Sequence, residues 1–190
     1  MSEEMYDVLD ENGVKIGQTL PERRVHEQEL WHGAAFIWIY NAKGELLLQF
    51  RAPDKGIFAS VWDVSAAGHV DASETPIQAA VRELQEELGV VISPEELTAL
   101  GECADTFPMK SGNIHKEYDW LFLLRKDIEF SALTLQRSEL TNVKWIPLDK
   151  LAADLKKPNW KNTYAGRNEF VYNVAINEIK KRVDKNWDEL

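Results

Sequence analysis

Three glutamates in one short segment have the type and the spacing to bind cations. Glu83, Glu86 and Glu87 lie between Gly68 and Val90. Glu86 is three residues after Glu83, and Glu87 is four residues after it. In a helix with about 100° per residue, this spacing places the three carboxylates on one face. Such a face suits hard divalent cations, which take oxygen ligands. A solvated acidic helix has the same spacing, so the glutamates alone leave both readings open.

The residues around the glutamates predict where this helix begins and ends. Thr75 and Pro76 predict its start, and Gln78 is placed to return to the amide of the capping threonine. Gly89 predicts its end. The buried stripe is predicted from apolar residues at helical spacing, namely Ile77, Val81, Leu84 and Leu88. The glutamates lie outside that stripe. Around the helix, only Ala79 and Ala80 fall among them, and these small side chains leave room for ions.

The rest of the chain predicts a single mixed α/β (α+β) domain over residues 1–190. It opens with a strand, a two-residue turn at Asn12-Gly13 and a second strand, followed by a helical stretch that ends near Leu30. Later strands are expected at "AAFIWIY", "ELLLQF", "VWDVSAAG", "LTALGECADTF", "EYDWLFLLR" and "TNVKWIPL". Helices are expected at "LDKLAADLKK" and over residues 168–187.

Composition excludes several classes of protein. A formal net charge of -10 disfavours a polymeric nucleic-acid partner, whose binding needs a concentrated basic surface. The longest apolar runs are far shorter than the roughly 20 residues of a membrane helix, and the acidic start does not resemble a secretory signal. The single cysteine, Cys103, cannot form an internal disulfide. We therefore expect a cytoplasmic protein without a membrane partner.

The segment over residues 68–90 resembles the Nudix box at every fixed position. The matching residues are Gly68, Glu74, Arg82-Glu83-Leu84, Glu86-Glu87 and Gly89-Val90. So many fixed positions at fixed spacing rarely coincide. The resemblance implies an α/β/α sandwich with a mixed sheet and a catalytic loop-helix-loop. Residues 1–33 would then form an N-terminal extension of hairpin and helix.

The resemblance also implies roles for the residues of the box. Glu83, Glu86 and Glu87 would ligate Mg²⁺ or Mn²⁺, to which Gly68 would add a backbone carbonyl. The family reaction is hydrolysis of a diphosphate linked to another group, by a water that the cations activate. Glu74 and Arg82 would brace the loop and helix, or form a purely structural ion pair. The carboxylate that takes the proton of the water is Glu86, Glu87 or Glu117, and the sequence does not choose among them.

The flanking stretches resemble a narrower branch, the isopentenyl-diphosphate isomerases and their hydrolase-like relatives. These stretches are "HEQELWHGAAFIWIYNAKGELLLQFRAPDK", "WDVSAAGH" and "HKEYDWLF". In the isomerases, histidines and glutamates at matching places hold a metal. The residues at those places here are His26, His32, His69, His115 and Glu117. They form either a second metal site or a scattered set of polar histidines, and the spacing from His26 to His32 is one residue shorter than in the isomerases.

Two further comparisons with the isomerases bear on the reaction. The isomerase pattern places a catalytic cysteine after the tryptophan that matches Trp62, where this chain has Ser65, Ala66 and Ala67. The isomerases commonly have degenerate Nudix boxes, whereas the box of this chain keeps every acidic residue, so hydrolysis is favoured.

Arg51 and Lys55 match positions that hold the diphosphate in the isomerases, although they also suit a charged surface loop. The loop over residues 108–116 is expected to cover the substrate, with Phe107, Tyr118 and Trp120 either stacking on it or packing in the core.

The sequence therefore predicts a divalent-metal-dependent hydrolase that cleaves a diphosphate linkage in a small molecule. One alternative is an isomerase-like or phosphatase activity on a prenyl diphosphate. The other is a diphosphate-binding module without catalysis. The family resemblance also suggests a homodimer.

Overall fold

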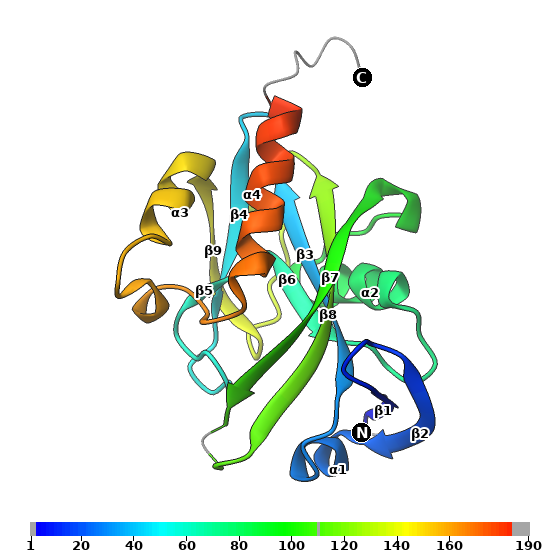
Figure 1. The fold of residues 1–190 in the computed structure, drawn as a ribbon. Helices are drawn as coiled ribbons and strands as arrows, with labels where there is room; N and C mark the ends of the chain where they lie inside the picture. Colours follow the sequence, from blue (N-terminus) through cyan, green and yellow to red (C-terminus); the bar gives the residue numbers. More distant parts are fainter. Residues whose placement is uncertain (1–2, 110, 184–190) are drawn as a thin grey trace.

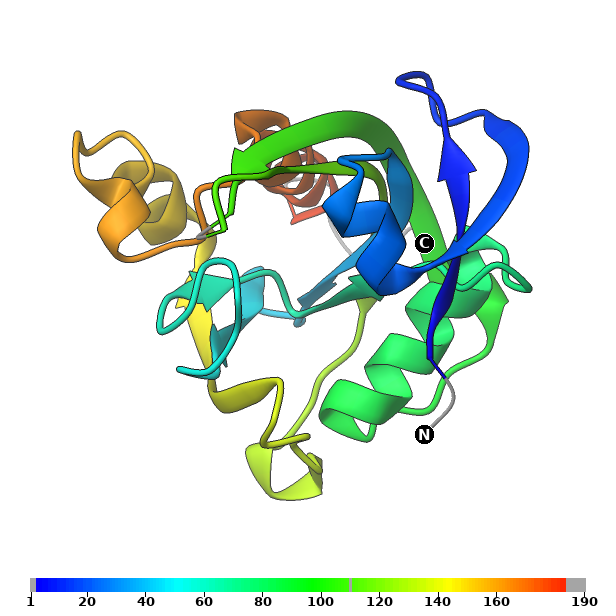
Figure 2. The ribbon, with the colours of Figure 1, turned by 90° about the horizontal axis from the view of Figure 1, so that it is seen from below.

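The computed structural model describes residues 3–109 and 111–183, and it shows a mixed β-sheet between helices. Helix α2 (Pro76–Leu88) covers one face, and α3 (Leu148–Asp154) and α4 (Glu169–Val183) cover the other (Figures 1 and 2). The predicted α/β/α sandwich is confirmed. None of the helices in the described residues is long and apolar enough to cross a membrane.

Seven strands form the main sheet, and two form a separate hairpin. The main strands are β3 (His32–Tyr40), β4 (Glu45–Arg51), β5 (Trp62–Asp63), β6 (Ala66–His69), β7 (Leu97–Pro108), β8 (Ile114–Arg125) and β9 (Leu140–Pro147). Their order is β5-β4-β3-β8-β7, with β6 paired to β3 and β9 paired to β4. Only the β3–β8 pair is parallel among the described pairings of this sheet. The short 3-10 helices are η1 (Pro94–Glu96), η2 (Phe130–Ala132) and η3 (Trp160–Asn162).

Strand β3 separates two hydrophobic cores. All nine of its residues are buried, as expected for a strand covered on both faces. Phe36 and Trp38 point toward α3 and α4, whereas Ile37 and Ile39 point toward α2, because successive side chains of a strand alternate. The side to which a β3 residue points therefore decides which part of the site it can reach.

Strands β3 and β4 diverge, and this divergence splits a predicted strand. The stretch "VWDVSAAG" was expected to form one strand, but it forms β5 against β4 and β6 against β3. Between them, the Ser65 hydroxyl donates to Leu47 O at 2.6 Å and accepts from the Ile39 amide at 2.7 Å. Ser65 thus satisfies backbone groups of both strands where they no longer pair with each other.

The N-terminal hairpin forms from β1 (Met5–Leu9) and β2 (Lys15–Pro21), followed by α1 (Glu22–Glu27). Its turn is not the expected two-residue turn. Asp10 N donates to Val14 O at 2.8 Å, and Gly13 N donates to Asp10 O at 3.1 Å. Gly13 alone supplies the positive φ, of 78°, so the loop is longer and bulged.

One other boundary differs from the prediction, and one is described only in part. Strand β8 begins at Ile114, so His115 and Lys116 belong to a strand and not to the loop. The C-terminal helix, expected over 168–187, is α4 through Val183, and positions 184–187 lie outside the described residues.

Candidate active site

Helix α2 has the predicted ends but a different buried face. The Thr75 amide donates to Gln78 Oε1 at 2.8 Å, and Gly89 ends the helix with a φ of 71°. Ile77 and Val81 are only half-buried. The fully buried residues are Ala79, Ala80, Leu84, Glu87 and Leu88. The small alanines allow α2 to approach β3 and β6 closely, which turns Glu87 inward.

Arg82 connects the loop before α2 with two of the three glutamates. Its Nε and Nη2 donate to the two carboxylate oxygens of Glu74 at 2.9 and 3.0 Å. Its Nη1 donates to Glu83 at 2.6 Å and to Glu86 at 3.1 Å. Nη2 also donates to His69 O at 2.8 Å. One guanidinium therefore fixes both the Glu74 loop and the direction of two carboxylates, as a planar five-donor group can.

Gly68 lies directly beneath the Glu83 carboxylate. A Cβ at position 68 would overlap the carboxylate of Glu83. The backbone of β6 and the carboxylate can approach this closely only because residue 68 has no side chain. The structure thus brings together Gly68 and Glu83, two of the predicted metal-binding residues.

Glu87 lies beneath the acidic face instead of on it. The side chain is 2% exposed. Its Oε2 accepts hydrogen bonds from Gln49 Nε2 and from the Ala67 amide, both at 3.1 Å. The expectation that Glu87 is free of core contacts is therefore wrong. The helical pattern could not show that β4 and β6 supply polar partners at this point.

The glutamates of α2 lie where negative charge is costly. Burial, followed by the charge of Glu83, raises the pKa of Glu87 well above its usual value. Burial also raises the pKa of Glu83, although Arg82 opposes that rise. Glu86 differs, because its side chain is 51% exposed. A nearby cation would offset the charge that burial disfavours.

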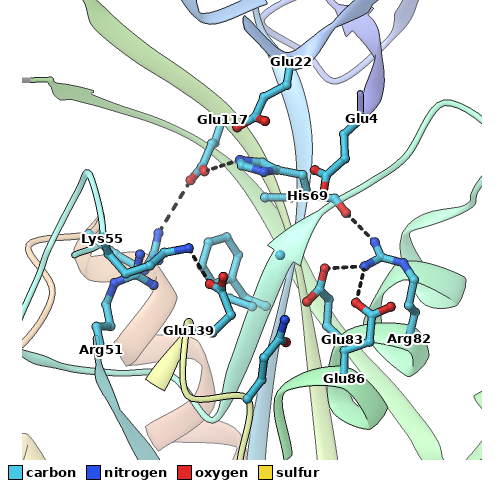
Figure 3. Close-up of a pocket in the computed structure, with 16 residues that line it drawn as sticks. Glu4, Glu22, Arg51, Lys55, His69, Arg82, Glu83, Glu86, Glu117 and Glu139 are labelled. Atoms are coloured by element: carbon cyan, nitrogen blue, oxygen red, sulfur yellow. Dashed lines mark hydrogen bonds and ion pairs between the residues drawn. The ribbon is translucent and has the colours of Figure 1, made fainter. Parts of the chain in front are cut away.

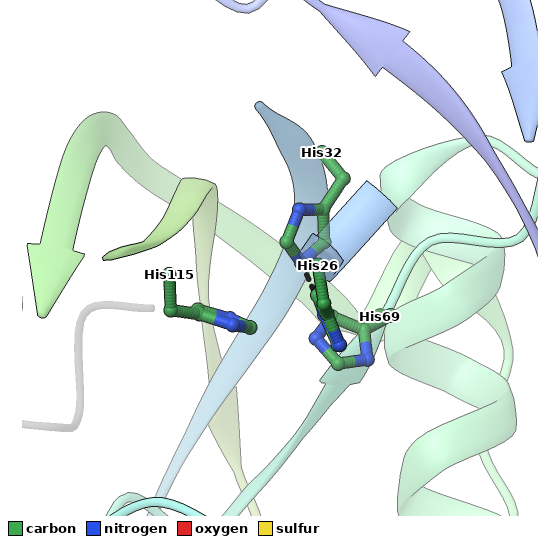
Figure 4. Close-up of side chains that lie close together, drawn as sticks. All are labelled: His26, His32, His69 and His115. Carbon is green, nitrogen blue, oxygen red and sulfur yellow. Dashed lines mark hydrogen bonds between the residues drawn. The ribbon is translucent and has the colours of Figure 1, made fainter. Parts of the chain in front are cut away.

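The register of the sheet assembles the histidines from four segments. His32 on β3 is opposite Glu117 on β8, and His69 on β6 is opposite Ala34 on β3. His115 lies two residues before Glu117 and therefore on the same face. His26 reaches the group from α1. Figure 4 shows the four imidazoles side by side, and the ligand atoms that they offer lie within 4.8 Å of one another.

Hydrogen bonds orient several of these rings. Tyr6 Oη lies 3.0 Å from His69 Nδ1, and Leu30 O lies 3.1 Å from His32 Nδ1. The Nε2 atoms of these two rings face the cluster. In metal sites, a histidine ligand is oriented in this way by a hydrogen bond to its other ring nitrogen. His26 Nε2 and His32 Nε2 are 3.4 Å apart.

Glu117 is the carboxylate of this cluster. Its Oε1 lies 2.7 Å from His115 Nε2 and 3.3 Å from His69 Nε2. Burial would raise the pKa of Glu117, but the bonds from His115 and His69 hold it well below its usual value. Burial lowers the pKa of His26 to about 4 and that of His32 well below its usual value. Burial would also lower the pKa of His69, but the hydrogen bond to Glu117 raises it. The neutral imidazoles of His26 and His32 have the protonation of metal ligands.

The predicted basic residues lie across the cavity from α2. Lys55 forms an ion pair with Glu139, and Arg51 Nη1 lies 3.3 Å from Asp63 Oδ2. Arg51 also donates through Nε and Nη2 to Ile57 O, at 3.3 and 3.2 Å. Arg51 therefore holds the loop between β4 and β5 as well as facing the cavity (Figure 3).

The carboxylates and cations meet in one cavity of about 350 Å³. Six glutamates and four arginine or lysine side chains line it, from α2, β4, β8, the N-terminal extension and three loops (Figure 3). A second cavity of about 220 Å³ shares Arg51, Lys55 and His69 with the first. It adds an apolar wall, namely Ile57, Phe58, Phe107 and Met109.

Of the three predicted aromatic residues, the structure brings only Phe107 to the cavities. Its ring stacks on His115 with centroids 5.1 Å apart. Tyr118 packs against the turn at Gly13, and Trp120 packs on the α2 side of the sheet. The described part of the loop reaches the histidine cluster through Asn113 Nδ2, which donates to His26 O at 3.4 Å.

Sequence reasoning missed several residues of the site. Glu4 and Glu22 line the cavity from the N-terminal extension, and Gln136 and Glu139 line it from the loop before β9. Arg167 lines both cavities and pairs with the buried Asp63. None of them belongs to a local motif, and the cavity brings them together from segments that are far apart in the sequence.

Comparisons with known proteins agree with this geometry. The NUDIX domain family model matches residues 30–165. The chain is 34% identical over 161 residues to Nudix hydrolase 3 of Arabidopsis thaliana, covering 83% of this chain but only 21% of that protein. It is 35% identical to an uncharacterized Nudix hydrolase of Clostridium acetobutylicum, covering 80% of this chain and 74% of that protein.

An isomerase and a solved structure are also similar to this chain. The isopentenyl-diphosphate Delta-isomerase of Escherichia coli is 31% identical, with coverage of 84% of this chain and 86% of the isomerase. The crystal structure of DR0079 from Deinococcus radiodurans has a TM-score of 0.66 at 21% identity and covers 90% of this chain and 97% of that one. The last likeness concerns the fold alone.

Proposed function

The chain belongs to the Nudix hydrolase family, and we propose that it cleaves a diphosphate linkage in a small molecule with divalent cations held by α2. The substrate we favour is a nucleoside diphosphate, or a similar diphosphate, linked to another group. The observation that carries the proposal is the crowding of carboxylates around one cavity, where six glutamates face four arginine or lysine side chains. A diphosphate carries negative charge of its own, so it would enter such a cavity only together with cations.

Glu83, Glu86 and Glu87 would hold these cations beside the backbone at Gly68. The donor set fits, because hard carboxylate oxygens suit Mg²⁺ or Mn²⁺ and because burial makes added positive charge favourable at Glu83 and Glu87. Bound cations would offset the charge of the phosphoryl oxygens and activate water. The chain itself supplies the bracing, since Arg82 orients Glu83 and Glu86 and ties them to Glu74.

Among the three candidates for the general base, Glu86 fits best. Glu87 is buried beneath the cavity, and Oε1 of Glu117 is engaged by two histidines. Glu86 lines the cavity and remains half-exposed. It is therefore placed to accept the proton of the attacking water.

The four histidines and Glu117 form a second candidate cation site. Besides the convergence of the nitrogens, two buried atoms without partners support this site. His115 Nδ1 and Glu117 Oε2 are buried and lack a hydrogen-bond partner among the described residues. Imidazole and carboxylate together suit Mn²⁺ or a transition metal.

The same cluster favours an isomerase-like or phosphatase activity on a prenyl diphosphate as the second candidate function. The apolar wall around Phe107 is compatible with a prenyl chain. Isomerisation, however, needs a proton donor, and the inert Ala67 lines the cavity next to Gly68. Cys103 lies on β7, half-buried on the α4 side of the sheet. We therefore place hydrolysis first and a binding module without catalysis last.

A substrate panel distinguishes the three functions. The chain is dialysed against EDTA, supplied with Mg²⁺ or Mn²⁺, and assayed with nucleoside diphosphate derivatives and with isopentenyl diphosphate. Cation-dependent cleavage of a diphosphate bond is the expected result. Isomerisation without phosphate release would support the second function, and binding without turnover the third.

Paired variants test the base assignment. Glu86→Gln should lower turnover far more than Glu96→Gln, because Glu96 is an exposed glutamate in an ion pair with Lys126, away from the cavity. Equal activity of these two variants would reject Glu86 as the base.

A further inference from the structure

Asp63 is a buried carboxylate that holds two guanidinium groups. Arg167 donates to it through Nε at 2.9 Å and through Nη2 at 2.8 Å. Arg51 Nη1 lies 3.3 Å from the same Oδ2. Asp63 has no exposed surface, and although burial would raise its pKa, Arg167 and Arg51 hold the pKa below its usual value. One negative charge therefore orients two positive charges.

Arg167 is itself buried, yet part of its guanidinium has no hydrogen-bond acceptor. The residue is 6% exposed, and the guanidinium lies 4.2 Å from the centre of the Phe36 ring. Nε and Nη2 are used by Asp63, but Nη1 makes no hydrogen bond within the described part of the chain. Its nearest charged neighbour is Glu117 Oε2 at 3.5 Å, in an ion pair only. Arg167 lines both cavities, so the N–H groups of Nη1 are placed to donate to an acceptor that binds there.

The position of Arg167 indicates what that acceptor is. Arg167 and Arg51 line both cavities, at the place where the acidic cavity joins the apolar wall. Asp63 offsets one of the two positive charges, and Glu117 opposes the other from 3.5 Å, without a hydrogen bond. Arginine pairs of this kind suit phosphate, because planar guanidinium groups donate to two of its oxygens at once.

We propose that Arg167, oriented by Asp63, joins the already predicted Arg51 in a subsite for the phosphate that carries the organic group of the substrate. This proposal rests on the proposed function. The other phosphate then faces Glu83 and Glu86, and the organic group faces the wall around Phe58. Arg167 is a substrate-binding residue, and Asp63 is a positioning residue that acts through both arginines.

Binding of inorganic pyrophosphate with Mg²⁺ tests the subsite without requiring turnover. Titration calorimetry on the full chain is expected to show that Arg167→Lys binds pyrophosphate roughly ten- to a hundredfold more weakly, since a hydrogen bond to a charged group is lost. Arg182→Lys is the matched control, because Arg182 on α4 also donates to a carboxylate, that of Glu178 at 3.0 Å, but lies outside both cavities. Unchanged affinity in Arg167→Lys would overturn the proposal.

A second variant tests the subsite in case the single variant does not fold. Removing Arg167 alone leaves the buried Asp63 with Arg51 as its partner cation, whereas Asp63→Asn combined with Arg167→Gln removes both charges of the Asp63–Arg167 pair together. Thermal unfolding identifies the folded variants. The double variant is expected to bind pyrophosphate at least tenfold more weakly, and native affinity in it would also overturn the proposal.

A kinetic measurement separates positioning from folding, with whichever substrate the panel identifies. Asp63→Asn should raise KM more than it lowers kcat, because the charge of Arg167 remains but its orientation is lost. A fall in kcat alone would contradict the role of Asp63. If the wild-type chain binds pyrophosphate but cleaves nothing, the proposed function fails and the subsite stands. If the chain is a hydrolase and the variants bind normally, only the subsite fails.

Discussion

The site has an acidic half and a histidine half, which are built in different ways. The acidic half consists of Gly68, Glu83 and Glu86, which line the cavity, and Glu87 beneath it, all within one segment of 23 residues. The histidine half consists of Glu117 and the four histidines, brought together from α1, β3, β6 and β8. A local segment builds the first, and the register of the sheet builds the second.

The two halves also differ in their charge. Burial raises the pKa values of Glu83 and Glu87, whereas hydrogen bonds from two histidines outweigh burial and depress the pKa of Glu117. Without cations, burial disfavours the charges of Glu83 and Glu87, whereas His115 and His69 stabilise the charge of Glu117. We therefore expect the acidic half to depend more strongly on added cations.

The largest effect is expected from Glu87→Gln. The glutamine keeps an oxygen for the bonds from Gln49 and the Ala67 amide, so the fold should persist. Turnover should fall on the order of a hundredfold or more, because the variant lacks a carboxylate that would hold the cations that activate the water. Steady-state assays with Mg²⁺ measure the change, with Glu96→Gln as the control. Wild-type turnover in Glu87→Gln would refute the role of the acidic half.

A smaller effect is expected from His32→Gln in the histidine half. The ring is fully buried and its Nε2 faces the cluster, so its loss should weaken Mn²⁺ binding at this half by about ten- to a hundredfold. Titration followed by Mn²⁺ paramagnetic resonance measures it. Combining His32→Gln with Glu87→Gln tells the two halves apart, because independent sites give additive losses. An unaltered Mn²⁺ isotherm in His32→Gln would show that the histidines bind no cation.

The difference between the halves also explains what the sequence predicts. The acidic half follows from spacing within one helix, and the hydrogen bonds at Thr75 and the φ of Gly89 confirm its ends. The histidines could be grouped only by resemblance to a family, since nothing local joins His26 to His115. Spacing along α2 also could not show that Glu87 turns inward, because its partners belong to β4 and β6.

Of the arginine subsite, the sequence predicts only Arg51, through its resemblance to a diphosphate-holding position of the isomerases. Asp63 and Arg167 are 104 positions apart, and no local spacing joins them. The divergence of β3 from β4 was equally hidden, because an apolar run such as "VWDVSAAG" reads the same whether it forms one strand or two. In both cases the deciding contact lies between distant segments, where local pattern carries no information.

The smallest effect is expected on stability in the absence of cations. The folded-state pKa of Glu87 is raised above the unfolded value of about 4.3. The resulting penalty is absent below that unfolded pKa, grows as pH rises, and is complete above the folded-state pKa. In EDTA, Glu87→Gln should therefore unfold a few degrees higher than the wild type at pH 8 and at the same temperature at pH 4.

Thermal unfolding with and without Mg²⁺ measures this difference. Added Mg²⁺ should narrow the gap at pH 8, because cations offset the buried charge of the wild-type glutamate. Glu96→Gln, which alters an exposed glutamate, should show no such dependence on pH. If Glu87→Gln were the less stable protein at pH 8 in EDTA, the acidic half would not be under electrostatic strain, and its contrast with the histidine half would disappear.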